Sequence, residues 1–189
     1  PFNAFGLDPT STNVTFATPF PVATSPQVIP GLMTVPNANS GKTRPAAGWP
    51  IVVFQHGITR NRTDMFAIAA TLAGQGFAVV AIDAPLHGLT DPTNPFFHNQ
   101  LFTGSPAASL ITGERTFDLD LSNNTTQAPG PDGKIDGSGT YFINLSSLLT
   151  SRDNLRQATS DLMELTRAIP SISLGVNPTG DFDGSRIEF

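Results

Sequence analysis

Cysteine is absent from this sequence of 189 residues, and charged side chains are scarce at 13%. The absence of cysteine excludes disulfides, thiolate zinc sites and a cysteine nucleophile. With 10 basic and 15 acidic residues and no cluster of Lys or Arg, the chain offers no electrostatic footprint for a nucleic acid. Neutral polar residues and turns must supply much of the solubility, a balance that is typical of exported proteins.

Long apolar runs are also missing. No stretch reaches the roughly 18 apolar residues of a membrane span, so we predict no transmembrane helix. The N-terminus has neither the basic nor the apolar part of a secretory signal and begins without methionine, so we expect a mature or truncated chain. A hydrophobic content of 39% over this length suits one domain rather than two.

Proline dominates the N-terminal region. Nine prolines lie within residues 1–50, and helices do not persist at that spacing. We therefore predict that residues 1–47 form short edge strands and turns, with strands near 14–17 and 31–35.

Two buried strands with a helix between them follow. Residues 51–55 and 77–83 are continuous apolar runs, typical of parallel strands that are covered on both faces. Between them, residues 64–74 show one apolar helical face, formed by Met65, Ile68, Ala69 and Leu72. Asn61 or Thr63 can cap the start of this helix, and Gly74 or Gly76 its end. The order strand, helix, strand predicts a parallel crossover.

The rest of the chain is less regular. Residues 85–147 show no periodicity, so we predict an insertion after the second core strand, which forms a lid or a wall of the substrate cleft. A second helix is predicted over 151–169, with one face formed by Leu155, Ala158, Leu162, Leu165 and Ile169. The sequence thus predicts an α/β fold, in which strands 51–55, 77–83 and 186–189 lie side by side in a mostly parallel sheet flanked by helices.

The turn after the first buried strand carries the strongest chemical signal. There the strand leads through His56 and Gly57 into the helix. Acyl transfer needs backbone N–H groups that point at the developing oxyanion, and the N–H of Ile58 is our candidate donor. Gly57 allows a tight turn and close approach of substrate. We expect the His56 imidazole to be structural and hydrogen-bonded to backbone, and Thr59 to contact substrate.

Other polar residues have less specific interpretations. Asp83 and His87 suggest an acid and a base, but a carboxylate at a strand end more often organises the turn that follows it. His98 either contacts substrate or lies in a surface loop.

Metal binding has weak support. The insertion contains four carboxylates whose chemistry suits calcium but whose spacing does not match the EF-hand: Asp118, Asp120, Asp132 and Asp136. The histidines lack the H-E-x-x-H spacing of a catalytic zinc site. We predict no cofactor and a solvated acidic loop, with calcium as the alternative.

A recognisable nucleophile is missing. The pattern G-x-S-x-G does not occur in the 189 residues. Ser138 lies between two glycines, but Asp136 stands where the pattern needs its first glycine, and the surroundings are turn rather than strand.

Residues 48–59 and 78–88 resemble the extracellular, virulence-factor lipases of Gram-negative bacteria, which belong to the α/β-hydrolase superfamily. Residues 114–120 and 151–157 resemble them too, and the likeness covers most of 35–189. It implies that residues 48–189 are the N-terminal half of a hydrolase domain and that strand 186–189 leads into Gly-His-Ser-x-Gly. The serine, acid and histidine of the triad would then lie beyond Phe189. The resemblance also implies secretion or a cell-envelope location in a Gram-negative bacterium.

The function that we predict is carboxylic-ester hydrolysis by a Ser-His-Asp mechanism, with lipid or short-chain esters as substrates. The missing C-terminal half of the protein would be a necessary partner. Two alternatives remain, namely epoxide or haloalkane hydrolysis with an Asp nucleophile, and a non-catalytic binding module. Expressed alone, the 189 residues are expected neither to hydrolyse esters nor to fold as a stable monomer, because nothing would cover strand 186–189.

Overall fold

The computed structural model of the chain describes residues 2–5, 14–17, 19–23, 27–101, 113–175 and 180–189. Its main feature is a four-stranded sheet in the order β3-β5-β4-β6. β4 (Trp49–Phe54) runs parallel to both β5 (Ala78–Ile82) and β6 (Phe182–Glu188), whereas β3 (Gly31–Thr34) is antiparallel to β5. The predicted mostly parallel sheet and its strand neighbours are confirmed, although the last strand begins earlier, at Phe182.

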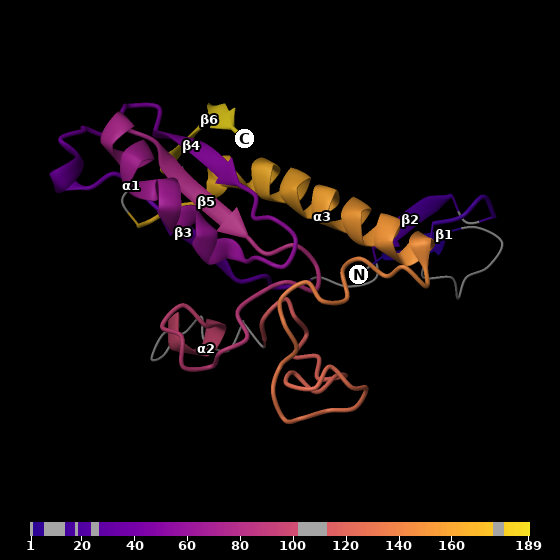
Figure 1. The fold of residues 1–189 in the computed structure, drawn as a ribbon. Coiled ribbons are helices and arrows are strands. Elements are labelled where there is room, and N and C mark those ends of the chain that lie inside the picture. Colours follow the sequence, from indigo (N-terminus) through magenta and orange to yellow (C-terminus); the bar gives the residue numbers. More distant parts are fainter. Residues whose placement is uncertain (1, 6–13, 18, 24–26, 102–112, 176–179) are drawn as a thin grey trace.

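Helices pack on both faces of this sheet (Figure 1). The core on the face of α3 (Leu148–Ala168) contains Ala78, Val80, Leu162, Leu165 and Ile169. The core on the face of α1 (Phe66–Gln75) contains Met65, Leu72, Val79 and Ala81. Successive β5 residues therefore point into different cores, which explains why this strand is apolar without alternation.

The start and the end of the first helix follow the predicted signals. The Asn61 side chain caps the 3₁₀ turn η2 (Arg62–Met65), which leads into α1, and accepts the N–H of Thr63 at 3.1 Å. Gly76 ends α1 with a left-handed φ of 88°, while Gly74 lies inside the helix.

The long helix differs from its prediction at its start. α3 begins at Leu148 rather than at residue 151, because Ser147 acts as N-cap and its Oγ accepts the Thr150 N–H at 3.4 Å. A 3₁₀ turn, η4 (Ile169–Ser171), follows its end. Leu155, which we expected in the core, is 50% exposed. The reason is visible in Figure 1, where the N-terminal half of α3 extends beyond the sheet and only its C-terminal half packs on it.

A separate pair of strands lies near the start of α3. β1 (Phe2–Phe5) and β2 (Phe20–Ala23) are antiparallel and form their own two-stranded sheet (Figure 1). The predicted strand at 14–17 is wrong, because side chains of α3 rather than a partner strand bind the backbone there. Asp153 accepts the Val14 N–H at 2.9 Å, and Arg152 donates to the Val14 carbonyl.

The described part of the predicted insertion is mostly turns. It contains one short helix, α2 (His98–Leu101), and an isolated bridge between Ser122 and Pro129, while residues 102–112 lie outside the described residues. The segment 136–142 lies at the carboxyl ends of β4 and β5, where the Gly139 N–H donates to Leu86 O at 2.9 Å. This is the end of the sheet at which parallel α/β folds place ligands, as predicted; a lid function stays a prediction.

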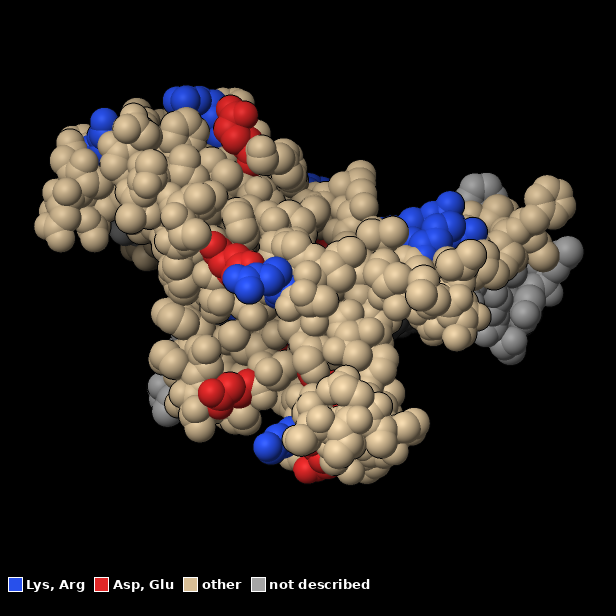
Figure 2. Space-filling view, viewed as in Figure 1, with Lys and Arg blue, Asp and Glu red and all other residues tan. Residues whose placement is uncertain are grey.

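The visible surface is sparsely charged. Figure 2 shows Lys and Arg side chains scattered over this face, several of them next to Asp or Glu, with broad uncharged areas between them. Among the described residues, no helix combines the length and the apolar character that a membrane crossing requires.

Gly48 offers a test of how β4 and β6 are joined. Its φ is +101°, and a Cβ there would lie 2.6 Å from the carbonyl carbon of Phe182. We predict that Gly48→Ala lowers the free energy of unfolding by about 2 kcal/mol or more, because it adds both backbone strain and a clash with backbone. As a control, Gly74→Ala in open space on α1 should stabilise the protein by about 0.5–1 kcal/mol. Urea unfolding measures both, and equal effects would contradict the described approach of the two strands.

Candidate active site

The loop between β4 and α1 holds the predicted oxyanion donor. A hydrogen bond from the Arg60 N–H to Gly57 O, at 3.1 Å, closes this loop. Thr59 has a left-handed φ of 69°, which is strained for a β-branched residue. Ile58 is 52% exposed, and none of the described residues accepts a hydrogen bond from its N–H. That N–H is therefore available to an external acceptor.

His56 is buried beneath this loop and is hydrogen-bonded to backbone, as we expected; that it takes no part in proton transfer stays a prediction. Its Nδ1 donates to Gly57 O at 2.8 Å, and its Nε2 accepts the N–H of Ala84 at 3.0 Å. Both ring nitrogens are occupied by backbone, and this pattern requires a neutral ring with the proton on Nδ1.

His87 is bound in the same way from the neighbouring loop. Its Nδ1 donates to Pro85 O at 2.8 Å, and its Nε2 accepts the N–H of Thr59 at 3.2 Å. Burial lowers the pKa of the His87 imidazole, which also favours the neutral ring. His87 does not pair directly with Asp83. Thr59, our candidate substrate contact, uses its N–H on His87, and its side chain remains exposed.

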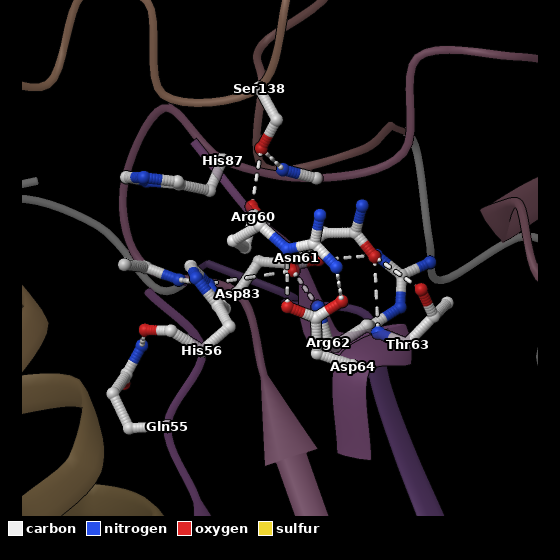
Figure 3. Close-up of polar contacts among 12 residues, drawn as sticks. Gln55, His56, Arg60, Asn61, Arg62, Thr63, Asp64, Asp83, His87 and Ser138 are labelled. Atoms are coloured by element: carbon white, nitrogen blue, oxygen red, sulfur yellow. Dashed lines mark hydrogen bonds and ion pairs between the residues drawn. The ribbon is translucent and has the colours of Figure 1, made fainter. Parts of the chain in front are cut away.

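A fully buried ion network lies beneath the loop, and our sequence analysis missed it. The Arg62 guanidinium donates to Asp83 Oδ2, to Glu114 Oε2 at 2.5 Å and to Glu114 Oε1 at 2.8 Å (Figure 3 shows the Asp83 side). Asp83 Oδ1 also accepts the Arg62 backbone N–H at 2.7 Å. Burial raises the pKa of Asp83, although the charge and hydrogen bonds of Arg62 oppose the shift.

This network corrects the role that we expected for Asp83. Its carboxylate organises the start of η2 after β4, not the turn that follows its own strand, because Arg62 reaches across between the two strand ends. One signal could have pointed to Arg62. A cation in the first turn of a helix is unfavourable next to the helix dipole, so its presence there suggests a different role.

Glu114 and Arg115 connect the insertion to η2 and to α3. Glu114 also accepts the N–H of His98 at 2.8 Å, and His98 Nδ1 lies 3.8 Å from Glu114 Oε1. Arg115 forms an ion pair with Asp161 of α3. The predicted substrate contact His98 is thus placed beside Glu114 at the start of α2 rather than at the Ile58 loop. Substrate binding by His98 stays a prediction.

Ser138 bridges the two loops. Its Oγ donates to Arg60 O at 2.6 Å and accepts the N–H of Gly88 at 3.1 Å (Figure 3). Both bonds are to backbone, so this hydroxyl is a structural connector between the loop after β4 and the loop after β5.

Three of the four carboxylates of the predicted acidic loop accept backbone N–H groups. Asp120 binds the N–H groups of Asp132 and Gly133, Asp132 binds those of Asn124 and Lys134, and Asp136 binds those of Leu121 and Ser122. Asp118 is exposed. Among the described residues, no three His, Cys, Asp or Glu side chains are grouped as metal ligands.

One hollow of about 210 Å³ lies beside Glu114. It is lined by Gln27, Val28, Gly113, Glu114, Arg115, Phe117 and Asp118. None of residues 56–59 lines this hollow, so it is separate from the candidate oxyanion donor.

A comparison with known families gives one match. Residues 21–87 match the family described as platelet-activating factor acetylhydrolase, isoform II. The matched region begins in β2 and includes β3, β4, the Ile58 loop, α1 and β5, about a third of the chain. No curated protein and no solved structure matches the chain. The match supports a relation to lipases and esterases of the α/β-hydrolase type, while the narrower likeness to Gram-negative lipases stays a prediction.

The buried network predicts a large difference between two neighbouring arginines. Arg62→Met should lower the free energy of unfolding by about 3–5 kcal/mol near neutral pH, because two buried carboxylates lose their cation. The loss should shrink as the pH falls. Burial raises the pKa of Asp83, and without Arg62 nothing opposes that shift, so the folded state then binds more protons than the unfolded state and gains stability on acidification.

Arg60 is the matched control. Its ion pair with Asp64 is exposed, so Arg60→Met should change stability little. Urea unfolding of both variants at several pH values makes the comparison. Equal losses in the two variants, or a loss in Arg62→Met that does not depend on pH, would contradict this account of the network.

Proposed function

We propose that this chain contributes the oxyanion loop of a carboxylic-ester hydrolase, with the Ile58 N–H as one donor. The observation that carries the proposal is an N–H without a partner among the described residues, in an exposed turn at the carboxyl end of a buried parallel strand. The residues around it are fixed by buried hydrogen bonds, so the donor costs little reorganisation when charge develops on a substrate carbonyl oxygen.

The family match supports the same chemistry. The name of the matched family describes removal of an acetyl group from platelet-activating factor. The matched residues include the strand, the Ile58 loop and the helix after it, the unit that supplies an oxyanion N–H in α/β-hydrolases. We propose lipid or short-chain esters as the substrate class, and an exported location, which the low content of charged residues supports.

The groups that would attack the ester and move protons are proposed to lie outside these 189 residues. His56 and His87 each have both ring nitrogens bound to backbone groups, so neither is free to act as a general base. The Ser138 Oγ is likewise engaged by Arg60 O and the Gly88 N–H. We therefore propose that a serine, a histidine and an acid come from other polypeptide, while the residues of this chain supply charge stabilisation and positioning.

Removal of the donor is the direct test. Ile58→Pro deletes the backbone N–H, so in the full-length protein it should lower kcat for an activated short-chain ester by about 10²–10³-fold. Ile58→Val keeps the N–H and a β-branched side chain, so it should keep kcat close to that of the wild type. Circular dichroism checks that both variants fold. A folded Ile58→Pro variant with wild-type kcat would refute this assignment.

Ser138 provides a second test. Ser138→Ala should reduce stability by about 1 kcal/mol, because two backbone groups lose a partner. The variant should still react with a serine-directed phosphonate, since its hydroxyl is not the proposed nucleophile. Loss of phosphonate labelling in a folded Ser138→Ala protein would place the nucleophile in this chain. If the wild-type protein turns over epoxides or haloalkanes and resists the phosphonate, an Asp nucleophile replaces the proposed serine.

A further inference from the structure

Two buried histidines, both labelled in Figure 3, connect the loops that follow β4 and β5, and each binds the backbone of the opposite loop. His56 lies in the loop after β4, and its Nε2 accepts the Ala84 N–H of the other loop at 3.0 Å. His87 lies in the loop after β5, and its Nε2 accepts the Thr59 N–H of the first loop at 3.2 Å. The ring centroids are 4.8 Å apart. We call this arrangement the histidine clasp.

The clasp requires both rings to be neutral. In each ring Nδ1 donates to a carbonyl of its own loop, Gly57 O for His56 and Pro85 O for His87. Nε2 then has no proton, and its lone pair faces the backbone N–H of the opposite loop. Protonation of Nε2 would place its new N–H against the backbone N–H of the opposite loop, so the hydrogen bond would be replaced by a repulsion between two donors.

The two anchored positions enclose the candidate donor. His56 precedes Gly57 and Ile58, and Thr59 follows them, so the Ile58 N–H lies between the two ends that the clasp holds. We propose that His56 and His87 are positioning residues, which orient the Ile58 N–H toward the oxyanion only while both rings are neutral, and that acid releases this loop. The inference rests on the proposed ester hydrolysis, because the orientation of the donor matters only if an oxyanion forms.

A third segment, residues 136–142, packs against the histidine clasp. The Phe142 ring meets the His87 ring edge-on, with centroids 4.8 Å apart. Gly139 lies directly over the bond between His87 and Thr59. A Cβ at this glycine would be 2.9 Å from the Thr59 nitrogen and would collide with the imidazole. Only glycine therefore fits here without opening the clasp.

Burial favours a neutral His87. It lowers the pKa of the imidazole, and a charge on His56 would lower that pKa further, while the hydrogen bond to Pro85 O and the charge of Asp83 oppose the shift. Asp83 Oδ1 is 3.7 Å from His56 Nε2, but this carboxylate is already engaged by Arg62. The aromatic ring and the glycine of the third segment do not titrate.

The direction of the pH effect follows from the lowered pKa. The folded state holds His87 neutral at pH values where the unfolded state already binds a proton. The stability that the clasp provides is therefore complete above the ordinary histidine pKa of about 6.5 and decreases as the pH falls below it.

The first experiment reads the rings directly and needs no turnover. The full-length protein is labelled with ¹⁵N at histidine, and His56→Gln and His87→Gln assign the two ring signals. At mildly alkaline pH, long-range proton–nitrogen spectra should show both rings with the proton on Nδ1 and none on Nε2. A proton on Nε2 of either ring under these conditions would overturn the proposal.

The second experiment compares two replacements of His87 by the pH dependence of kcat. Gln carries an acceptor at about the reach of Nε2 and does not titrate, so His87→Gln should keep its alkaline kcat and show a less steep acid limb than the wild type. Asn is too short to reach Thr59, so His87→Asn should lower kcat about 10²-fold at all pH values, the loss that a displacement of ~1 Å causes, with KM little changed. Identical profiles for the two variants would overturn the proposal.

Glycine variants repeat the test without changing a titratable group, in case His87→Asn does not fold. Gly139→Ala should lower kcat about as much as His87→Asn, because it opens the same bond. Gly133→Ala is the matched control, since this glycine also has a left-handed φ, of +80°, but has open space around it. It should keep the wild-type kcat, and equal losses in the two variants would count against the clasp.

The ring spectra and the measurement of ester turnover together distinguish failure of the clasp proposal from failure of the proposed function. The expected ring pattern without any ester turnover would overturn ester hydrolysis and support the clasp as a structural device. Ester turnover with a proton on Nε2 of either ring would support ester hydrolysis and overturn the clasp.

Discussion

The buried guanidinium of Arg62 is the contact on which the geometry of the site depends. It joins three segments that are far apart in the chain, namely the start of η2 after β4, the end of β5 through Asp83, and the insertion through Glu114. One cation faces two carboxylates without exposure to water, so each partner needs the others to be in place. The segments around the Ile58 loop are therefore fixed together rather than one by one.

Above this ion network, the same loops are connected by groups that are neutral. The histidine clasp uses imidazole nitrogens and backbone amides, and Ser138 adds two more backbone hydrogen bonds. An oxyanion donor benefits from this arrangement, because neutral supports fix the N–H without placing a second negative charge near the charge that develops on the substrate. The Asp83 carboxylate, 3.7 Å from His56 Nε2, is already paired with Arg62.

The family match includes the Ile58 loop and both histidines of the clasp. The matched residues end at His87, the second member of the clasp, and the insertion that closes the clasp from outside lies beyond them. The matched residues form a unit of strand, loop, helix and strand. The segment 136–142, which covers the two loops of this unit, lies outside the family match. Ser138, in the middle of that cover, binds backbone groups of both loops.

The sequence by itself determined β4, α1, β5 and the turn between β4 and α1. Continuous apolar runs defined β4 and β5, a helical repeat and the cap at Asn61 defined α1, and His56-Gly57 marked the turn between them, because these patterns are local. The same local reasoning failed at residues 14–17 and at Leu155, where contacts with α3 and the edge of the sheet decide the outcome.

Only the tertiary structure decided what holds the loop. The bond between Thr59 and His87 spans 28 residues, and that between Arg62 and Glu114 spans 52, with no periodic pattern to connect either pair. Such pairs form because parallel strands end at the same edge of a sheet and because an insertion folds back over that edge. Whether a histidine is a free base or a neutral clasp depends on which backbone amide meets its second nitrogen, and that is a property of the fold.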